Sequence, residues 1–206
     1  LVITSTIFPI YYVAITSKNG NQEVNFLGHN FVNTSLLNYS IAFAYLIIAL
    51  LSPILSSIAD YKGNKKSFMR LFCYMGSLAC AGLYFFTSDA LSVGIVCSTI
   101  AAIGYCGSLV FYNAYLPEIA TETERDKVSA QGFAYGYIGS VLLQIVCFVF
   151  VFKPDWFHWL GIYNEGDASR FSFLMVGVWW FAFAHIPLIK LPRGEAQPYN
   201  GGHTIL

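Results

Sequence analysis

The stretch that decides the fold is LNYSIAFAYLIIALLSPILSSIADYKGNKK, residues 37–66. Its first part, 37–59, contains no charged side chain and is rich in Leu, Ile and Ala. A helix needs about 20 mainly apolar residues to cross the hydrocarbon core of a bilayer. The apolar part therefore predicts a transmembrane helix. The acid, glycine and lysines that follow predict a turn at one membrane surface.

The rest of the chain repeats this pattern. Of its 206 residues, 56% are hydrophobic and 11% are charged, whereas soluble domains carry about 25% charged residues. The apolar runs are too long and too continuous for the strands of a membrane barrel. We therefore expect an all-α membrane protein with six transmembrane helices in residues 1–191, and a cytoplasmic tail or the start of a central linker at 192–206. The predicted spans are Leu1 to Thr16, Leu37 to Ala59, Phe68 to Thr87, Leu91 to Tyr115, Val128 to Phe152 and Phe171 to Leu191.

The connections between these spans differ in charge. One set carries eight basic residues, namely Lys62, Lys65, Lys66, Arg70, Arg125, Lys127, Lys190 and Arg193. The other set carries three, namely Lys18, Lys153 and Arg170. Because cytoplasmic loops are enriched in Lys and Arg, the first set and both chain ends are predicted to be cytoplasmic.

Several classes of function lack their sequence signals. Eleven Lys and Arg balance eleven Asp and Glu, and no basic run indicates a nucleic-acid partner. The five cysteines form no Cys-x-x-Cys pair, so the sequence predicts no metal site. No nucleotide-binding G-x-x-x-x-G-K-[ST] motif occurs. We expect no cofactor, no catalytic residue and no enzymatic activity.

The connection between the second and third spans carries a candidate conformational motif. Asp60 closes one helix, Gly63 permits a tight turn with positive φ, and Lys65 and Lys66 follow. On composition alone, this is an ordinary turn at a cytoplasmic membrane surface.

The same connection resembles the loop signature of the major facilitator superfamily. Ser57 stands where that signature has Gly, and Asn64 where it has Arg. The resemblance implies that Asp60 belongs to a charged latch that holds one conformation. Glu118 and Arg125, in the next predicted cytoplasmic loop, would belong to the same latch.

A second motif narrows the resemblance. It comprises GSLVFYNAYLPEIA (107–120) and GFAYGYIG (132–139). With Phe8-Pro9 in the first span and Trp179-Trp180 in the sixth, these stretches resemble the vacuole-effluxer-like branch of the major facilitator superfamily.

This resemblance implies a fold and a function. Members have about twelve spans in two halves, each built from two three-helix repeats. The chain would be the N-terminal half of a secondary active transporter for a small solute, with an amino acid as one candidate. Its partners would be the lipid bilayer, the solute and a missing C-terminal half. It would lie in a bacterial plasma membrane, or in the vacuolar membrane if the source is a fungus.

Polar side chains inside the spans are candidates for a solute cavity. The resemblance implies that spans one, two, four and five line that cavity. The candidates are Thr6, Tyr11, Tyr105, Asn113 and Gln144.

One face of the fifth span carries small residues. Gly132, Gly136 and Ser140 recur every four residues, and Gln144 continues the row, so all four share one helix face. Small residues let helices approach closely, which predicts helix packing along this row. The alternative is that Gln144 faces the solute cavity.

Two other functions stay open. Ser108 in the fourth span and His185 in the sixth suggest an intramembrane serine protease, although no Gly lies two residues before the serine. The other alternative is a complete six-span transporter that acts as a homodimer. Leu1 stands where a complete chain has Met, and the first span is short, so we expect a fragment instead.

Overall fold

The computed structural model describes residues 2–17 and 21–192, with the backbone alone for 2–5 and 60–62. The elements in chain order are α1 (Val2–Thr16), β1 (Glu23–Phe26), β2 (His29–Val32), α2 (Asn33–Lys62), α3 (Lys65–Gly82), η1 (Leu83–Phe85), α4 (Leu91–Ala114), α5 (Leu116–Ile119), α6 (Arg125–Phe152), η2 (Pro154–Leu160) and α7 (Glu165–Lys190). The long helices confirm the prediction of an all-α membrane protein.

Each predicted span coincides with one helix: α1, α2, α3, α4, α6 and α7. Within the described residues, five of these are long and apolar enough to cross a membrane, and α1 is a shorter apolar helix. Lipid offers no hydrogen-bond partners, so each span must satisfy its own backbone as a helix. This requirement explains why apolar length alone located these elements.

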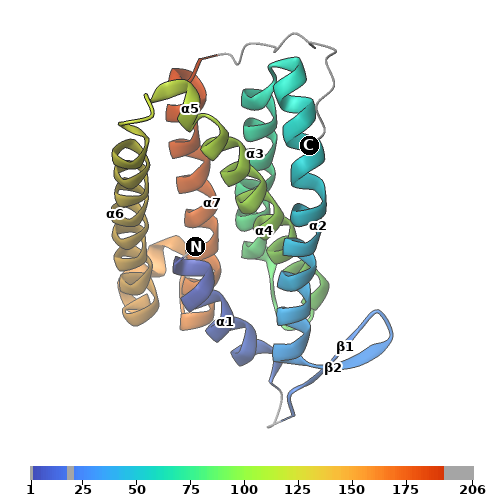
Figure 1. Ribbon diagram of the computed structural model, residues 1–206. Helices are drawn as coiled ribbons and strands as arrows, with labels where there is room; N and C mark the ends of the chain where they lie inside the picture. Colours follow the sequence, from blue (N-terminus) through green and yellow to red (C-terminus); the bar gives the residue numbers. More distant parts are fainter. Residues whose placement is uncertain (1, 18–20, 193–206) are drawn as a thin grey trace.

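The helices form one bundle in which α3 is central (Figure 1). α3 packs between α4 and α7, α2 covers α4, and α6 lies against α7. α1 contacts α6, α7 and α2. In the most apolar 18-residue stretch of α3, 44% of the residues are buried, whereas the share in the corresponding stretch of α2 is only 11%. The exposed apolar side chains of α2 are therefore available to lipid or to further protein.

Three glycines bring the helix backbones around α3 into contact. A Cβ at Gly104 of α4 would lie 2.5 Å from the Cα of Gly76 in α3. A Cβ at Gly177 of α7 would lie 2.6 Å from the carbonyl oxygen of Ser77 in α3. No side chain fits at either crossing. Without a hydrophobic force between helices in lipid, such close van der Waals packing is a main source of association.

The connection between α1 and α2 contains a hairpin that the sequence analysis did not predict. β1 and β2 pair antiparallel, with Asn25 opposite Asn30. Their two-residue turn places Leu27 and Gly28 at φ +52° and +82°. Positive φ at both positions is typical of the turn whose twist matches that of the strands. The hairpin projects beside the first turns of α2 (Figure 1).

Four helices, α2, α3, α6 and α7, begin three to six residues earlier than predicted, and a side-chain hydrogen bond accompanies the start of two of them. α2 begins at Asn33 rather than at Leu37, and the Asn33 Oδ1 accepts a hydrogen bond from the Thr34 amide at 2.7 Å. α7 begins at Glu165 rather than Phe171, and the Asn164 side chain accepts from the amide of the third helical residue. Capping of this kind satisfies backbone donors that a helix start leaves free.

Candidate functional site

The turn between α2 and α3 has the geometry that the motif predicts. Gly63 adopts φ +64°. The Asn64 amide donates to the carbonyl oxygen of Ala59 at 3.0 Å. A glycine in the left-handed region commonly ends a helix in this way, because it has no Cβ to clash.

The two lysines after this turn join three separate segments. Lys65 Nζ lies 2.6 Å from Glu118 Oε1 of α5. Lys66 Nζ donates to the carbonyl oxygen of Leu191, just past α7, at 2.7 Å. A cation is unfavourable at a helix N-terminus and favourable at a C-terminus. Glu118 therefore compensates Lys65 at the start of α3, and Lys66 supplies positive charge to the end of α7.

The remaining motif residues, Arg125 and Asp60, are close in sequence to Glu118 and Lys65. Arg125 begins α6, and its Nη1 is 3.9 Å from Glu122 Oε1. Two of the acids in this loop, Glu118 and Glu122, thus each pair with a basic residue of the motif region. The backbone of Asp60 belongs to the last turn of α2, and its side chain lies outside the described residues. Its role in a latch stays a prediction.

Two of the predicted cavity residues bond to each other across helices. Gln144 Nε2 of α6 donates to Thr6 Oγ1 of α1 at 3.0 Å. The Thr6 hydroxyl also lies 3.3 Å from Gln144 Oε1. Gln144 is buried. This polar pair joins α1 to α6.

Two other predicted cavity residues lie apart from this pair. Tyr11 is buried, its hydroxyl donates to the carbonyl oxygen of Phe86 at 2.7 Å, and its ring meets Phe86 and Phe173 edge-on. Asn113 is exposed near the end of α4, where it borders a small hollow with Ser129. The five candidates therefore do not meet in one cavity.

The fifth predicted cavity residue, Tyr105 of α4, packs against α7. Its ring lies edge-on to Trp180, with centroids 6.4 Å apart. Tyr45 of α2 and Tyr137 of α6 lie within electrostatic range of its hydroxyl. Tyr45 and Tyr137 were not among the predicted residues, because tyrosines are common in this chain and their spacing does not single these two out.

The small-residue row of α6 packs only in part. A Cβ at Gly132 would lie 2.6 Å from the Tyr112 hydroxyl, whereas one at Gly136 would meet no atom within 4 Å. Ser140 bonds to its own helix, at the carbonyl oxygen of Tyr137, 2.9 Å away. Among the described residues, this row therefore packs against another helix at Gly132 but not at Gly136. The glycines that lie at close helix crossings are those around α3.

The geometry does not support a serine protease. The Ser108 hydroxyl donates to the carbonyl oxygen of Tyr105 at 2.9 Å. The His185 Nδ1 lies 2.7 Å from the carbonyl oxygen of Phe181, and its Nε2 lies 3.1 Å from the Tyr74 hydroxyl. A carbonyl only accepts, so Nδ1 carries the proton and Nε2 accepts from Tyr74 in the neutral ring. His185 thus joins α7 to α3 and does not activate Ser108. Among the described residues, no three His, Cys, Asp or Glu side chains are grouped to hold a metal ion.

Comparison with known proteins gives a consistent result. The family model described as vacuole effluxer Atg22-like matches residues 14–206. An uncharacterised MFS-type transporter, YxiO of Bacillus subtilis strain 168, is 34% identical over 92% of this chain and 42% of its own length. Autophagy-related protein 22-2 of Aspergillus oryzae is 22% identical over 91% of this chain and 40% of its own length. The chain thus spans about two fifths of these relatives. No solved structure matches the chain significantly.

Proposed function

This chain belongs to the vacuole effluxer Atg22-like family, and we propose that it forms the six-helix N-terminal half of a secondary active transporter for a small solute. The relatives are transporters and not enzymes. In this proposal, residues 1–191 form the membrane half. Residues 192–206 lead toward a second half, which this chain does not contain.

The observation that carries the proposal is a reciprocal pattern of helix contacts. If the chain contains two three-helix repeats, α1, α2 and α3 of the first repeat correspond in order to α4, α6 and α7 of the second. Each contact between the repeats should then have a counterpart. The contact between α2 and α4 has its counterpart in the contact between α6 and α1, and the contact between α3 and α4 has its counterpart in the contact between α7 and α1. Contact between α3 and α7 maps onto itself. These pairs are in contact, which supports two three-helix repeats of the kind found within each half of major facilitator transporters.

The solute that we propose is an amino acid. Tyr45, Tyr105 and Tyr137 are tyrosines of α2, α4 and α6, and Gln144 and Thr6 add neutral polar groups in α6 and α1. Tyrosine rings attract a cationic amine, and hydroxyl groups donate to a carboxylate. Neutral hydrogen-bonding groups of this kind in the spans therefore suit a zwitterion better than a strongly charged solute.

A transport assay tests this proposal directly. The full-length protein that contains this chain is reconstituted in liposomes, and counterflow of labelled amino acids is compared with that of labelled sugars. We expect counterflow of at least one amino acid. Tyr105→Ala should abolish it, whereas Tyr135→Ala, at an exposed position of α6, should leave it intact. Sugar counterflow alone, or none at all, would contradict the proposal.

The same preparation distinguishes a half from a complete transporter. We expect residues 1–206 alone to show no counterflow, because a site between two halves needs both. Robust counterflow by residues 1–206 would instead favour a homodimer of six-helix units.

We also propose that the end of the bundle with the α2–α3 turn and α5 faces the cytoplasm. These two segments lie at the same end (Figure 1), and the connections predicted for it carry eight of the eleven basic residues. Single cysteines at Asn64 and Asn25, in a background without native cysteines, test this with a membrane-impermeant thiol reagent. Position 25 should be labelled in intact cells and position 64 should not. The reverse result would invert the topology.

A further inference from the structure

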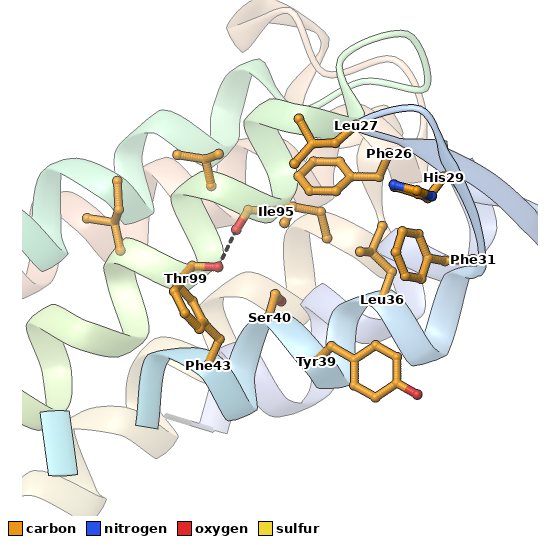
Figure 2. Close-up of a pocket in the computed structure, with 12 residues that line it drawn as sticks. Phe26, Leu27, His29, Phe31, Leu36, Tyr39, Ser40, Phe43, Ile95 and Thr99 are labelled. Carbon is orange, nitrogen blue, oxygen red and sulfur yellow. Dashed lines mark hydrogen bonds between the residues drawn. The ribbon is translucent and has the colours of Figure 1, made fainter. Parts of the chain in front are cut away.

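A pocket of about 430 Å³ lies where the β1–β2 hairpin folds over the space between α2 and α4 (Figure 2). Phe26 and Phe31 of the hairpin line one side. Leu36 and Phe43 line the α2 side, and Ile95 belongs to the α4 side. Pockets of about 300–1,000 Å³ are the usual size for small ligands. The pocket is therefore large enough to hold a ligand or part of one.

The two aliphatic hydroxyl groups of the lining, those of Ser40 and Thr99, are committed to their own helices. Ser40 Oγ donates to the carbonyl oxygen of Leu37 at 2.7 Å. Thr99 Oγ1 donates to the carbonyl oxygen of Ile95, also at 2.7 Å (Figure 2). Neither hydroxyl has a proton left to donate to a ligand. The interior thus favours hydrocarbon over a polar solute.

Polar groups are present where the pocket meets its surroundings. His29 is exposed on the hairpin, and Tyr39 is exposed on α2. The pocket therefore combines an apolar interior with polar groups at its rim. This combination suits an amphiphile whose chain is inside and whose head group is outside.

The depth of the pocket matches one leaflet of a bilayer. At 1.5 Å per residue, its α2 positions 36–43 lie about 5 to 15 Å along the axis from the helix start at Asn33. A leaflet contributes about half of the ~30 Å hydrocarbon core. Phe43 also continues into the exposed apolar face of α2 at Leu46 and Leu50. The pocket is thus continuous with a surface that lipid can reach.

The hairpin tip presents an apolar side chain at a conformationally unfavourable position. Leu27 has φ +52°, is highly exposed and lines the pocket rim. Side chains other than Gly, Asn and Asp seldom occupy this region. An exposed leucine at such a tip is consistent with contact to lipid rather than to water.

We propose that this pocket holds an acyl chain of a phospholipid from the leaflet at the hairpin end, with the head group beside His29. The bound lipid would fix the hairpin against α2 and α4. The proposal is independent of the solute that the protein carries.

Photolabelling of the full-length protein that contains this chain tests the proposal. The protein is placed in liposomes that contain phosphatidylethanolamine with a diazirine in one acyl chain. We expect label on peptides that include residues 36–43 and 95–100. Ser40→Trp fills the pocket and should lower this label at least threefold. Leu46→Trp, on the same helix but outside the pocket, should leave it unchanged. Equal labelling of all three proteins would overturn the proposal.

A second measurement identifies the occupant directly. Val96 lines the pocket, and its side chain is partly exposed. The photoreactive residue p-benzoylphenylalanine is placed at this position, and the protein is irradiated in liposomes of unmodified phospholipid. We expect an adduct with the mass of a phospholipid. A cross-link to another segment of the protein or to a second copy, or the absence of any lipid adduct, would reject an acyl chain as the occupant.

Discussion

Lys65 and Glu118 are 53 positions apart in the sequence, yet their charged groups lie 2.6 Å apart where α3 meets α5. Both side chains are partly exposed, so the pair contributes at most about 1 kcal/mol to stability. We propose that its value for function is positional, because it connects the loop after α4 to the turn before α3. With Lys66 on Leu191, it holds one end of the bundle in a fixed arrangement.

Reversing the charges of this pair should show that role. We expect Glu118→Lys to lower transport by the full-length protein several-fold, because Lys65 then faces a like charge. The double variant Lys65→Glu/Glu118→Lys should recover at least half of the loss. Transport is measured in liposomes at matched expression. Glu122→Lys, at a more exposed acid in the same loop, is the control and should have little effect. No recovery in the double variant would exclude a pairwise role.

The two glycine environments give an opposite pair of stability predictions. Gly104→Ala should lower the free energy of unfolding by about 1–3 kcal/mol, because a Cβ would lie 2.5 Å from the Cα of Gly76. Gly136→Ala should be neutral or stabilising by up to about 1 kcal/mol, because nothing lies within 4 Å and alanine favours the helix. Thermal unfolding in detergent compares the two. Equal midpoints would contradict the close crossing of α3 and α4.

The bond between Thr6 and Gln144 should be measurable as a coupling. Thr6→Val and Gln144→Leu should each destabilise the protein, while the double variant should cost less than their sum. Interhelical hydrogen bonds in membranes are worth about 0.6–2 kcal/mol, so we expect a coupling of that size. Unfolding in mixed micelles gives the four free energies. Additive effects would mean that the two side chains act separately.

Asn33 should matter more than Asn38, although both lie in the first two turns of α2. Asn33 is fully buried, and its Nδ2 donates to the Thr16 and Ser17 hydroxyls at 3.0 and 3.2 Å. We expect Asn33→Ala to cost about 1–3 kcal/mol, because it leaves these buried groups without that donor. Asn38 is exposed, and Asn38→Ala should change stability by less than about 0.5 kcal/mol. Similar unfolding midpoints for the two variants would show that the α1–α2 connection is not held by Asn33.

The long helices were predictable because the solvent is lipid. In lipid, apolar length almost determines that a segment is helical, so 37–59 and its counterparts were found from composition. The hairpin was not found, because its strands have four residues each and its turn is Leu-Gly rather than Asn-Gly. Strands so short leave almost no periodic signal.

The candidate site was predictable as a set of residues but not as a set of partners. Gly63 and the lysines after it follow from the motif, but the pairing of Lys65 with Glu118 depends on where α5 lies. Gln144 was singled out by its polarity inside a span, and only the rotation of two helices makes Thr6 its partner. Spacing by four predicted packing at Gly136. Spacing along one helix cannot show which face meets a neighbour, and here that position faces open space.

The close backbone contacts at Gly76, Gly104 and Gly177 affect how conformational changes of this protein can be measured. With no side chains between them at these crossings, α3, α4 and α7 have little freedom to slide against one another. A fluorophore on α3 therefore reports the displacement of that whole three-helix body. Leu78 points outward from α3 and is 68% exposed, which makes it the natural attachment point. A fluorophore on α6, which is buried far less, would add the motion of a single helix to the recorded distance.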